Sequence, residues 1–230
     1  MRVTTKAGQD LKRLYGADYV RAFEAHQSPQ RLKRLIKYIE LKPDYVVADF
    51  ACGNGMIMEY IAPKVKLYTG IDFSELFIQA AKRKQESQGI KNVEFVCSQI
   101  RDFCNKNPER FDIGLALDLS EHVYDREYLD ILKSIRGALK ESGRLYLHTP
   151  NAYFFLEIMK AHNCISIQLP EHIAVRTPED NIRLFKEAGF SETKLILLAH
   201  YNILKYIHPF SYLPAVGKYF KARIFIIAKK

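Results

Sequence analysis

Short apolar segments alternate with amphipathic helical patterns from Tyr45 onward, and this alternation restricts the fold more than any other feature of the chain. The apolar segments are rich in β-branched and aromatic residues, as in VVADF, and the segments between them repeat apolar residues at helical spacing. Such an alternation is typical of a largely parallel sheet covered by helices on both faces. The expected strands are 45–50, 66–72, 92–98, 111–117, 143–149, 192–199 and 222–228, and the expected helices are 56–61, 74–88, 126–140, 152–161 and 178–188.

The two ends of the chain depart from this alternation. Two further helices, 9–25 and 28–40, precede the first strand as a helical annex, and the last two strands have only residues 201–221 between them. We therefore predict an α/β fold with a seven-stranded Rossmann-like sheet, mostly parallel with a C-terminal antiparallel strand that forms a hairpin. The expected single domain spans 1–230, with a helical cap at 1–42 and a core at 43–230 that includes the 201–221 insertion.

Composition narrows the class of protein. The chain has 230 residues of which 48% are apolar, enough for one sizeable core. We see no apolar run as long as a membrane span and no signal-peptide pattern at the N-terminus, so we expect a cytoplasmic protein. Lys and Arg number 35 against 26 Asp and Glu, a net charge of +9 that favours anionic partners. No nucleic-acid motif accompanies this charge, so nucleic-acid binding is the less favoured interpretation.

The stretch VVADFACGNGM, from Val46 to Met56, runs from the first strand into a glycine-rich loop. Gly53 and Gly55 allow the backbone to approach a ligand and to take positive φ. A dinucleotide site would need the GxGxxG pattern, which this loop does not have, and no P-loop pattern is present. Asp49 places an acid at the strand end. An acid with no provision for phosphate suits a cationic nucleoside, S-adenosylmethionine.

The second strand ends in Gly70-Ile71-Asp72, and an acid at that place can accept hydrogen bonds from both hydroxyls of a ribose. Taken singly, an acid at a strand end is more often a helix cap, and a pair of glycines is more often a turn. The two acids together, one strand apart, favour a nucleoside site.

At this point the chain resembles the class I S-adenosylmethionine-dependent methyltransferases. VVADFACGNG matches their first motif, YTGID the second, and FDIGLAL their fourth strand. Within the class the chain is most similar to the O-methyltransferases of ubiquinone biosynthesis, through SPQRL, LDLSEHV and PEHIAVRTPEDNIRLFKEAGF. The resemblance covers residues 28–200. Ala51 departs from it, because the family usually has Gly there, and this puts the loop geometry in question.

The resemblance implies a set of cofactor contacts. Asp49 and Gly53 would lie under the methionine moiety, Asp72 would hold the ribose, and Arg31 would meet the carboxylate. Arg31 could instead lie on a solvated helix face, and Phe73 could pack in the core and not against the cofactor. The residues expected to contact the cofactor are Arg31, Asp49, Gly53, Gly55, Asp72, Phe73, Gln99, Ile100 and Leu117.

Catalysis is expected from Asp118, Glu121 and His122, which follow the fourth strand in the motif DLSEH. The resemblance implies that these three residues bind a divalent metal, and oxygen ligands would suit Mg²⁺. In a metal-free version His122 is the general base that takes the proton of an acceptor hydroxyl. The structural alternative is a helix start with capping acids. His148, Glu171 and His172 could also face the site, although structural roles are commoner for such residues.

Residues 201–221 form a long, aromatic and basic connection. We expect it to line an apolar substrate pocket or to lie on an anionic membrane surface at the inner face of the membrane; packing against the N-terminal helices is the alternative. The leading interpretation is an O-methyltransferase for a small-molecule hydroxyl, such as a prenylated phenol or a lipid-linked saccharide. The other interpretations are an N- or C-methyltransferase and a non-catalytic, cofactor-binding accessory protein.

Overall fold

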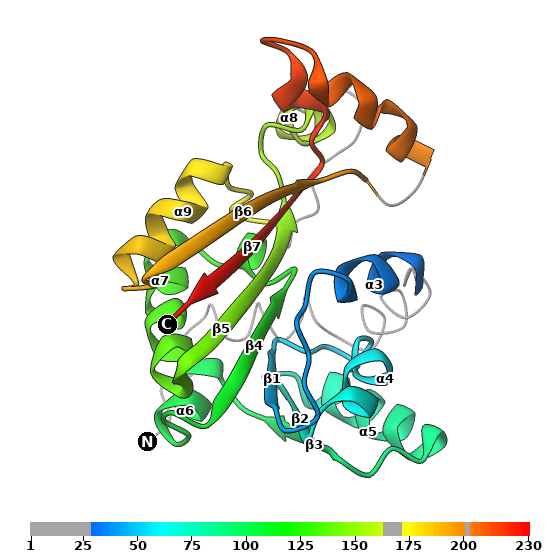
Figure 1. Ribbon diagram of the computed structural model, residues 1–230, viewed down its shortest axis with the longest axis vertical. Coiled ribbons are helices and arrows are strands. Elements are labelled where there is room, and N and C mark those ends of the chain that lie inside the picture. The colour runs from blue at the N-terminus through cyan, green and yellow to red at the C-terminus, as the bar shows by residue number, and fades with distance from the viewer. Residues whose placement is uncertain (1–28, 163–171, 201–202) are drawn as a thin grey trace. The chain divides into compact units, whose positions relative to one another are not determined.

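The computed structural model describes residues 29–162, 172–200 and 203–230 (Figure 1). The predicted helix at 9–25, Glu171, and the start of the 201–221 connection lie outside these residues. The chain divides into two compact units, residues 1–100 and 101–230, and each is described by itself. A single domain over 1–230 stays a prediction.

The first unit contains three parallel strands in the order β3-β2-β1. Strands β1 and β2 bury most of their side chains, and in β1 Val47, Ala48 and Phe50 are fully enclosed. Such strands read as continuous apolar runs because both faces of a parallel sheet are covered. The strands are β1 (Val46–Phe50), β2 (Leu67–Asp72) and β3 (Val93–Cys97).

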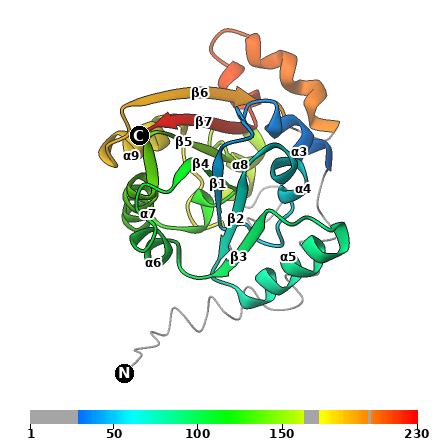
Figure 2. The same ribbon diagram turned by 60° about the horizontal axis from the view of Figure 1, so that its bottom comes forward.

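One helix of this unit has a capping residue at each end. Helix α5 (Glu75–Gln88) starts after Ser74, whose hydroxyl accepts a hydrogen bond from the backbone N–H of Phe77 at 3.4 Å, and stops at Gly89, which takes a left-handed φ of 65°. Figure 2 shows α5 running beside β3. The other helices are α3 (Pro29–Ile36), α4 (Met58–Ile61) and the 3₁₀ turn η1 (Ala62–Lys64).

The second unit contains four strands in the order β4-β5-β7-β6. Strand β4 (Phe111–Leu117) runs parallel to β5 (Leu139–Pro150), whereas β7 (Arg223–Lys229) is antiparallel both to β5 and to β6 (Glu192–Leu198). The predicted antiparallel hairpin is therefore confirmed, with its second strand inserted between β5 and β6. Seven mostly parallel strands with an antiparallel C-terminal strand also confirm the predicted fold class.

The helices of the second unit include one that the sequence analysis did not predict, α6 (Ile100–Asn105). Helix α9 (Pro178–Glu187) packs against α7 (Asp125–Ala138), and Figure 1 shows the two side by side. Thr177 caps α9 by accepting a hydrogen bond from the backbone N–H of Asp180 at 3.1 Å, as its TPED sequence predicts. The remaining helical segments are α8 (Phe155–Ala161) and the 3₁₀ segments η2 (Ser120–His122), η3 (Ile203–Tyr212) and η4 (Gly217–Phe220).

Several boundaries differ from the sequence-based expectation: the helix expected at 28–40 ends at Ile36, and the helix expected at 152–161 begins at Phe155. Helix α7 ends at Ala138, because Leu139 turns extended and pairs with Phe111 of β4, so Gly143 lies inside β5 and does not stop a helix. The connection before β7 is built largely of η3 and η4 and is not an irregular loop. Among the described residues, no helix has both the length and the apolar character that crossing a bilayer requires.

Candidate active site

The loop after β1 is held in a tight, left-handed conformation. Ala51, Gly53 and Gly55 have φ of 59°, 54° and 69°. The backbone N–H of Cys52 donates to the carbonyl of Ile71 at 3.0 Å, which ties the loop to β2. The positive φ expected of the glycines is confirmed, and Ala51 adopts the same region although it carries a side chain.

Phe95 on β3 forms the floor beneath this loop. A Cβ added to Gly70 would lie 2.5 Å from its ring, and one added to Gly55 would lie 2.9 Å from it. Real Cβ atoms do not come that close to a ring, so both positions need glycine for space, and Gly55 needs it also for its φ. The loop therefore rests directly on the sheet.

Two buried carboxylates lie at the ends of β1 and β2. Asp72 is 5% exposed, and its two oxygens accept from the backbone N–H groups of Gly53 at 3.0 Å and Ser74 at 2.8 Å. Asp49 accepts from the hydroxyl of Tyr68 at 2.5 Å. Burial raises the pKa of Asp49 to about 7 and that of Asp72 to about 6, the hydrogen bonds opposing the shift in each case. Asp72 thus anchors the glycine loop; its role toward a ribose stays a prediction.

The other residues expected at the cofactor occupy several elements. Arg31 on α3 places its guanidinium Nη2 3.7 Å from the sulfur of Met56, directly after the glycine loop, which brings this cation beside the loop. Phe73 follows Asp72 and is 38% exposed. Gln99 is exposed and Ile100 half-buried after β3, and Leu117, in the second unit, is half-buried at the end of β4.

The conformation of Ala51 carries a stability prediction. A left-handed φ costs a residue with a Cβ about 1–2 kcal/mol, a strain that glycine avoids. Part of the stability gained by a change to glycine is lost again, because glycine has more conformational freedom in the unfolded chain. We expect Ala51→Gly to raise the free energy of unfolding by about 1 kcal/mol in urea titration. Ala48→Gly, in the extended β1, is the control and should lower it; a lower value for Ala51→Gly as well would contradict the prediction.

The motif DLSEH lies in the second unit, where β4 ends. Asp118 takes a positive φ of 56°, and its carboxylate lies 2.8 Å from Nδ1 of His148 on β5. Its backbone N–H donates to the carbonyl of the same histidine at 2.7 Å. These contacts turn Asp118 toward β5, so its expected catalytic and metal-binding roles stay predictions.

Glu121 is almost completely buried, with 1% of its surface exposed. Its Oε2 accepts from the hydroxyl of Thr149 at 3.1 Å, and that hydroxyl accepts in turn from Ser120 at 2.7 Å. Burial, followed by the negative charge of Asp118, raises the pKa of Glu121 to about 8. Burial thus favours the protonated form of this carboxyl, and a bound cation would displace its proton.

Three side chains lie close together around η2. Glu121 and His122 belong to the predicted set, and His172 takes the place of Asp118. One potential ligand atom each from Glu121, His122 and His172 lies within 4.8 Å of the others. The imidazoles of His122 and His172 are perpendicular, with ring centres 5.1 Å apart, and burial and then His122 lower the pKa of His172 to about 4. Two imidazoles and a carboxylate suit Zn²⁺ and similar transition metals better than Mg²⁺, which prefers oxygen ligands.

The sequence analysis did not identify Arg176, which holds this region together. Its side chain is 4% exposed and donates from Nη2 to the carbonyl of Val123 at 2.7 Å, from Nη1 to the carbonyl of Ser120, and from Nε to Asp125 at 2.9 Å. The guanidinium also lies 4.8 Å from the ring centre of Tyr128. Arg176 therefore fixes both ends of η2.

Comparison with known proteins identifies the domain. Residues 47–143 match the family described as "Methyltransferase domain". The chain is 35% identical over 127 residues to "Ubiquinone biosynthesis O-methyltransferase" of Coxiella burnetii, covering 55% of this chain and 52% of that protein. The protein of the same name from Vibrio atlanticus is 26% identical over 187 residues, covering 78% of this chain and 77% of the relative. The chain thus spans about half the length of the Coxiella relative.

The fold is shared with solved structures. A "SAM dependent methyltransferase" from Archaeoglobus fulgidus superposes with a TM-score of 0.64 at 17% identity, covering 98% of this chain and 100% of the other. At that identity the likeness establishes the fold alone. Together with the match at residues 47–143, it confirms the resemblance to the class I methyltransferases drawn from the motifs.

Proposed function

We propose that this chain, which carries a methyltransferase domain at 47–143, is an S-adenosylmethionine-dependent enzyme that methylates a hydroxyl of a small-molecule acceptor. One observation carries the proposal: a left-handed glycine loop lies beside two buried carboxylates, Asp49 and Asp72. The pair disfavours a phosphate, whereas a sulfonium is attracted to it. The names of the ubiquinone-pathway relatives favour oxygen as the atom that is methylated.

In this proposal the cofactor lies against the loop of the first unit. Asp49 and Gly53 support its methionine part, Asp72 accepts from the ribose with the lone pairs that the loop leaves free, and Arg31 meets the carboxylate. Phe73, which is exposed, lies against the adenine. Gly55, Gln99, Ile100 and Leu117 complete the expected contacts.

The proposed reaction needs one general base for the acceptor hydroxyl. S-adenosylmethionine, when bound, would supply a methyl group activated by its sulfonium, and His122 would take the proton of the acceptor hydroxyl. The products are the methyl ether and S-adenosylhomocysteine. An N- or C-methyltransferase would not need Asp118, Glu121 and His122 to converge, and an accessory protein would bind the cofactor without turnover.

The experiment for this proposal is methyl transfer from labelled S-adenosylmethionine to a panel of alcohols and phenols. A general base contributes about a hundredfold or more, so His122→Ala should lower kcat by that factor while cofactor affinity stays within about twofold. His208→Ala, in η3, is the control. Unchanged turnover in His122→Ala would assign the base elsewhere, and tight cofactor binding with no transfer to any acceptor would favour the accessory protein.

As the alternative to His122 acting as a free base, we propose that Glu121, His122 and His172 bind a divalent transition metal, which when bound would make the acceptor hydroxyl more acidic. Zn²⁺ titrated into the full chain should bind by calorimetry, and His172→Ala should weaken binding by about tenfold or more, whereas Mg²⁺ should bind poorly. Equal Zn²⁺ affinity in wild type and His172→Ala would contradict this ligand set. Turnover that survives chelation would favour the metal-free role of His122.

The raised pKa values of Asp49 and Asp72 predict a pH dependence. S-adenosylmethionine carries a net positive charge, so it binds the ionised carboxylates and its affinity is lost as the pH falls through about 7 and about 6. We expect calorimetry to show at least tenfold weaker binding at about pH 5 than at about pH 8. S-adenosylhomocysteine has no net charge and should show a smaller change; equal slopes for the two would contradict an electrostatic role.

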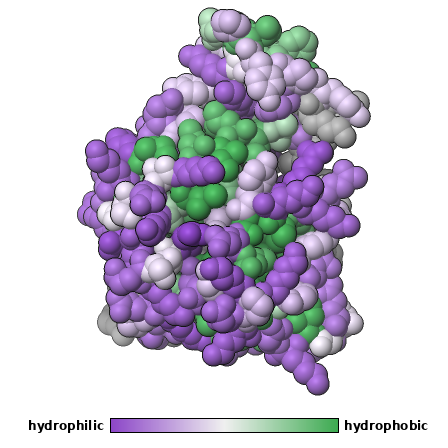
Figure 3. All heavy atoms as spheres, in the orientation of Figure 1, coloured by the Kyte–Doolittle hydropathy of each residue, from purple (hydrophilic) through white to green (hydrophobic). Residues whose placement is uncertain are grey.

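A third proposal concerns the segment between β6 and β7. Tyr206 is 70% exposed and Tyr212 81%, and Phe210, Leu213 and Val216 are also exposed around them. Figure 3 shows green, hydrophobic atoms where η3 and η4 lie at the top of the view. No acid follows Glu192 in the chain, whereas Lys218 and Lys221 belong to this segment. Exposed aromatics among cations fit the interface of an anionic bilayer, where a lipid-linked acceptor would be met.

Co-sedimentation with vesicles tests the membrane contact. The full chain should sediment with vesicles rich in phosphatidylglycerol more than with phosphatidylcholine alone, and replacing Tyr206, Phe210 and Tyr212 by Ser should abolish the difference. Ser in place of Tyr124, which is 64% exposed but belongs to the start of α7, is the control. Unchanged sedimentation of the triple variant would end this proposal.

A further inference from the structure

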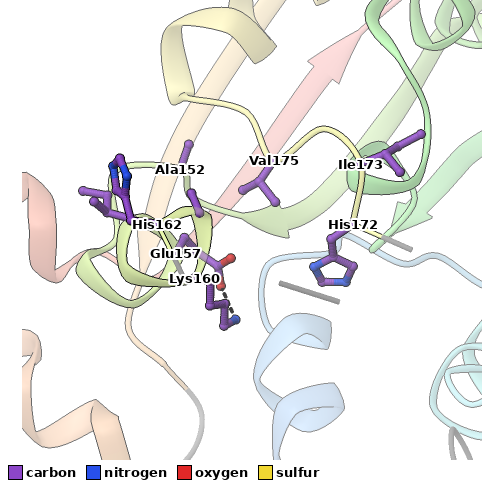
Figure 4. A pocket seen from close by; sticks show the side chains of 9 residues that line it. Ala152, Glu157, Lys160, His162, His172, Ile173 and Val175 are labelled. Carbon is purple, nitrogen blue, oxygen red and sulfur yellow. Dashed lines mark hydrogen bonds and ion pairs between the residues drawn. The ribbon is translucent and has the colours of Figure 1, made fainter. Parts of the chain in front are cut away.

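A pocket of about 530 Å³ in the second unit lies between α8 and the segment that begins at His172 (Figure 4). Figure 4 shows the side chains of Glu157 and Lys160 on one side of this pocket and His172 on the other. Its volume falls in the range of small-molecule sites. His172, which the sequence analysis named as a residue that could face the site, lines this pocket, whereas none of the expected cofactor contacts and none of Asp118, Glu121 and His122 does.

Glu157 is the unusual residue of this pocket. It lies in the first turn of α8 and is 7% exposed. Its Oε1 accepts from Nζ of Lys160 at 2.8 Å, whereas its Oε2 is buried and has no hydrogen-bond partner among the described residues. A buried acceptor without a donor is costly, so a ligand that donates a hydrogen bond to Oε2 would remove that cost.

The residues around Glu157 restrict the net charge and the polarity of a molecule that could bind in this pocket. Lys160 balances the charge of Glu157, so the pair attracts neither an anion nor a cation strongly. The remaining wall is largely apolar, with Ile158, Ile173 and Val175 among its side chains. Such a wall favours a molecule with an apolar body over a saccharide, which would bring several hydroxyls without partners.

His172 joins this pocket to the cluster at η2. It lines the pocket, and it also belongs to the group that it forms with Glu121 and His122. Its Nδ1 is buried and, like Oε2 of Glu157, makes no hydrogen bond among the described residues. A molecule in the pocket therefore has one polar anchor at Glu157 and can place another polar group beside the cluster.

We propose that this pocket is the acceptor site and that Oε2 of Glu157 accepts a hydrogen bond from a hydroxyl of an uncharged acceptor with an apolar body. The inference rests on the proposed methyltransferase function, because it assigns the pocket to the acceptor. Glu157 is then the residue that selects hydroxyl-bearing molecules, independently of the donor-binding loop.

Two fragments of equal shape test the assignment without turnover. Phenol and toluene differ by a hydroxyl in place of a methyl group, and NMR titration of the full chain can follow the methyl signals of Ile158 and Ile173. Wild type should bind phenol about tenfold more tightly than toluene, as a hydrogen bond to a charged group implies. Glu157→Met should remove this preference. Glu127→Gln, at an exposed position of α7, should keep it.

Glu157→Gln keeps a hydrogen-bonding side chain of the same size and guards against a failure of Glu157→Met to fold; it should retain part of the preference. An unchanged preference in both Glu157 variants would overturn the proposal, as would phenol shifts confined to residues outside the pocket or no binding of phenol to wild type. Because fragment binding is measured without S-adenosylmethionine, methyl transfer by a protein that fails this test would leave the proposed function standing.

Discussion

Replacement of Asp72 by alanine is expected to weaken S-adenosylmethionine binding by at least about a hundredfold in calorimetry. The carboxylate accepts from the backbone N–H groups of Gly53 and Ser74. Without it, the loop that should support the cofactor loses its anchor, and the buried N–H of Gly53 loses its acceptor. The charge that attracts the sulfonium is lost as well, so three effects act in one direction.

Two further measurements separate loop anchoring from direct contact. Asp112→Ala, which removes a carboxylate paired with Lys140 in the second unit, is the matched control and should leave affinity within about twofold. Binding of S-adenosylhomocysteine and of its 2′-deoxy analogue to wild type and to Asp72→Ala forms a double-mutant cycle. A coupling between hydroxyl and carboxylate would support the ribose contact, and near-wild-type affinity of Asp72→Ala would contradict the site itself.

The first unit was largely predictable because its signals are local. The glycine loop, the acids at two strand ends and the Ser74 cap each depend on residues that are close in sequence, and the parallel arrangement of the strands follows from their alternation with helices. The sequence did not show that Asp72 would bind the loop backbone, since an acid at that place can bind a ligand or a backbone equally well.

The second unit was less predictable because its polar contacts join distant residues. Arg176 donates to the carbonyl of Ser120, 56 positions earlier, and His148 meets Asp118 across 30 positions. No local pattern marks a lone arginine as the partner of a distant carbonyl. The proposed role of Glu157 could not be predicted from the sequence either, because the burial of this residue depends on the packing around α8.

Replacement of Arg176 by methionine is expected to lower the free energy of unfolding by about 2–5 kcal/mol, because it leaves two buried carbonyls without a donor. Methionine fills much of the buried volume, but it leaves the carbonyls of Ser120 and Val123 without their donor and breaks the ion pair with Asp125. These groups hold η2, so the variant should also place Glu121 and His122 less accurately and lose turnover even at temperatures where it stays folded. Urea unfolding gives the stability, and methyl transfer at low temperature gives the second effect.

Arg183 offers a control that shares a partner with Arg176. It pairs with Asp125 at 3.3 Å and with Glu187 at 3.0 Å, but its side chain is 49% exposed. Exposed pairs contribute little, so Arg183→Met should change the free energy of unfolding by less than about 1 kcal/mol. A similar loss in both variants would mean that Asp125, and not the buried carbonyls, determines the effect. Full stability of Arg176→Met would remove Arg176 from its proposed role at η2.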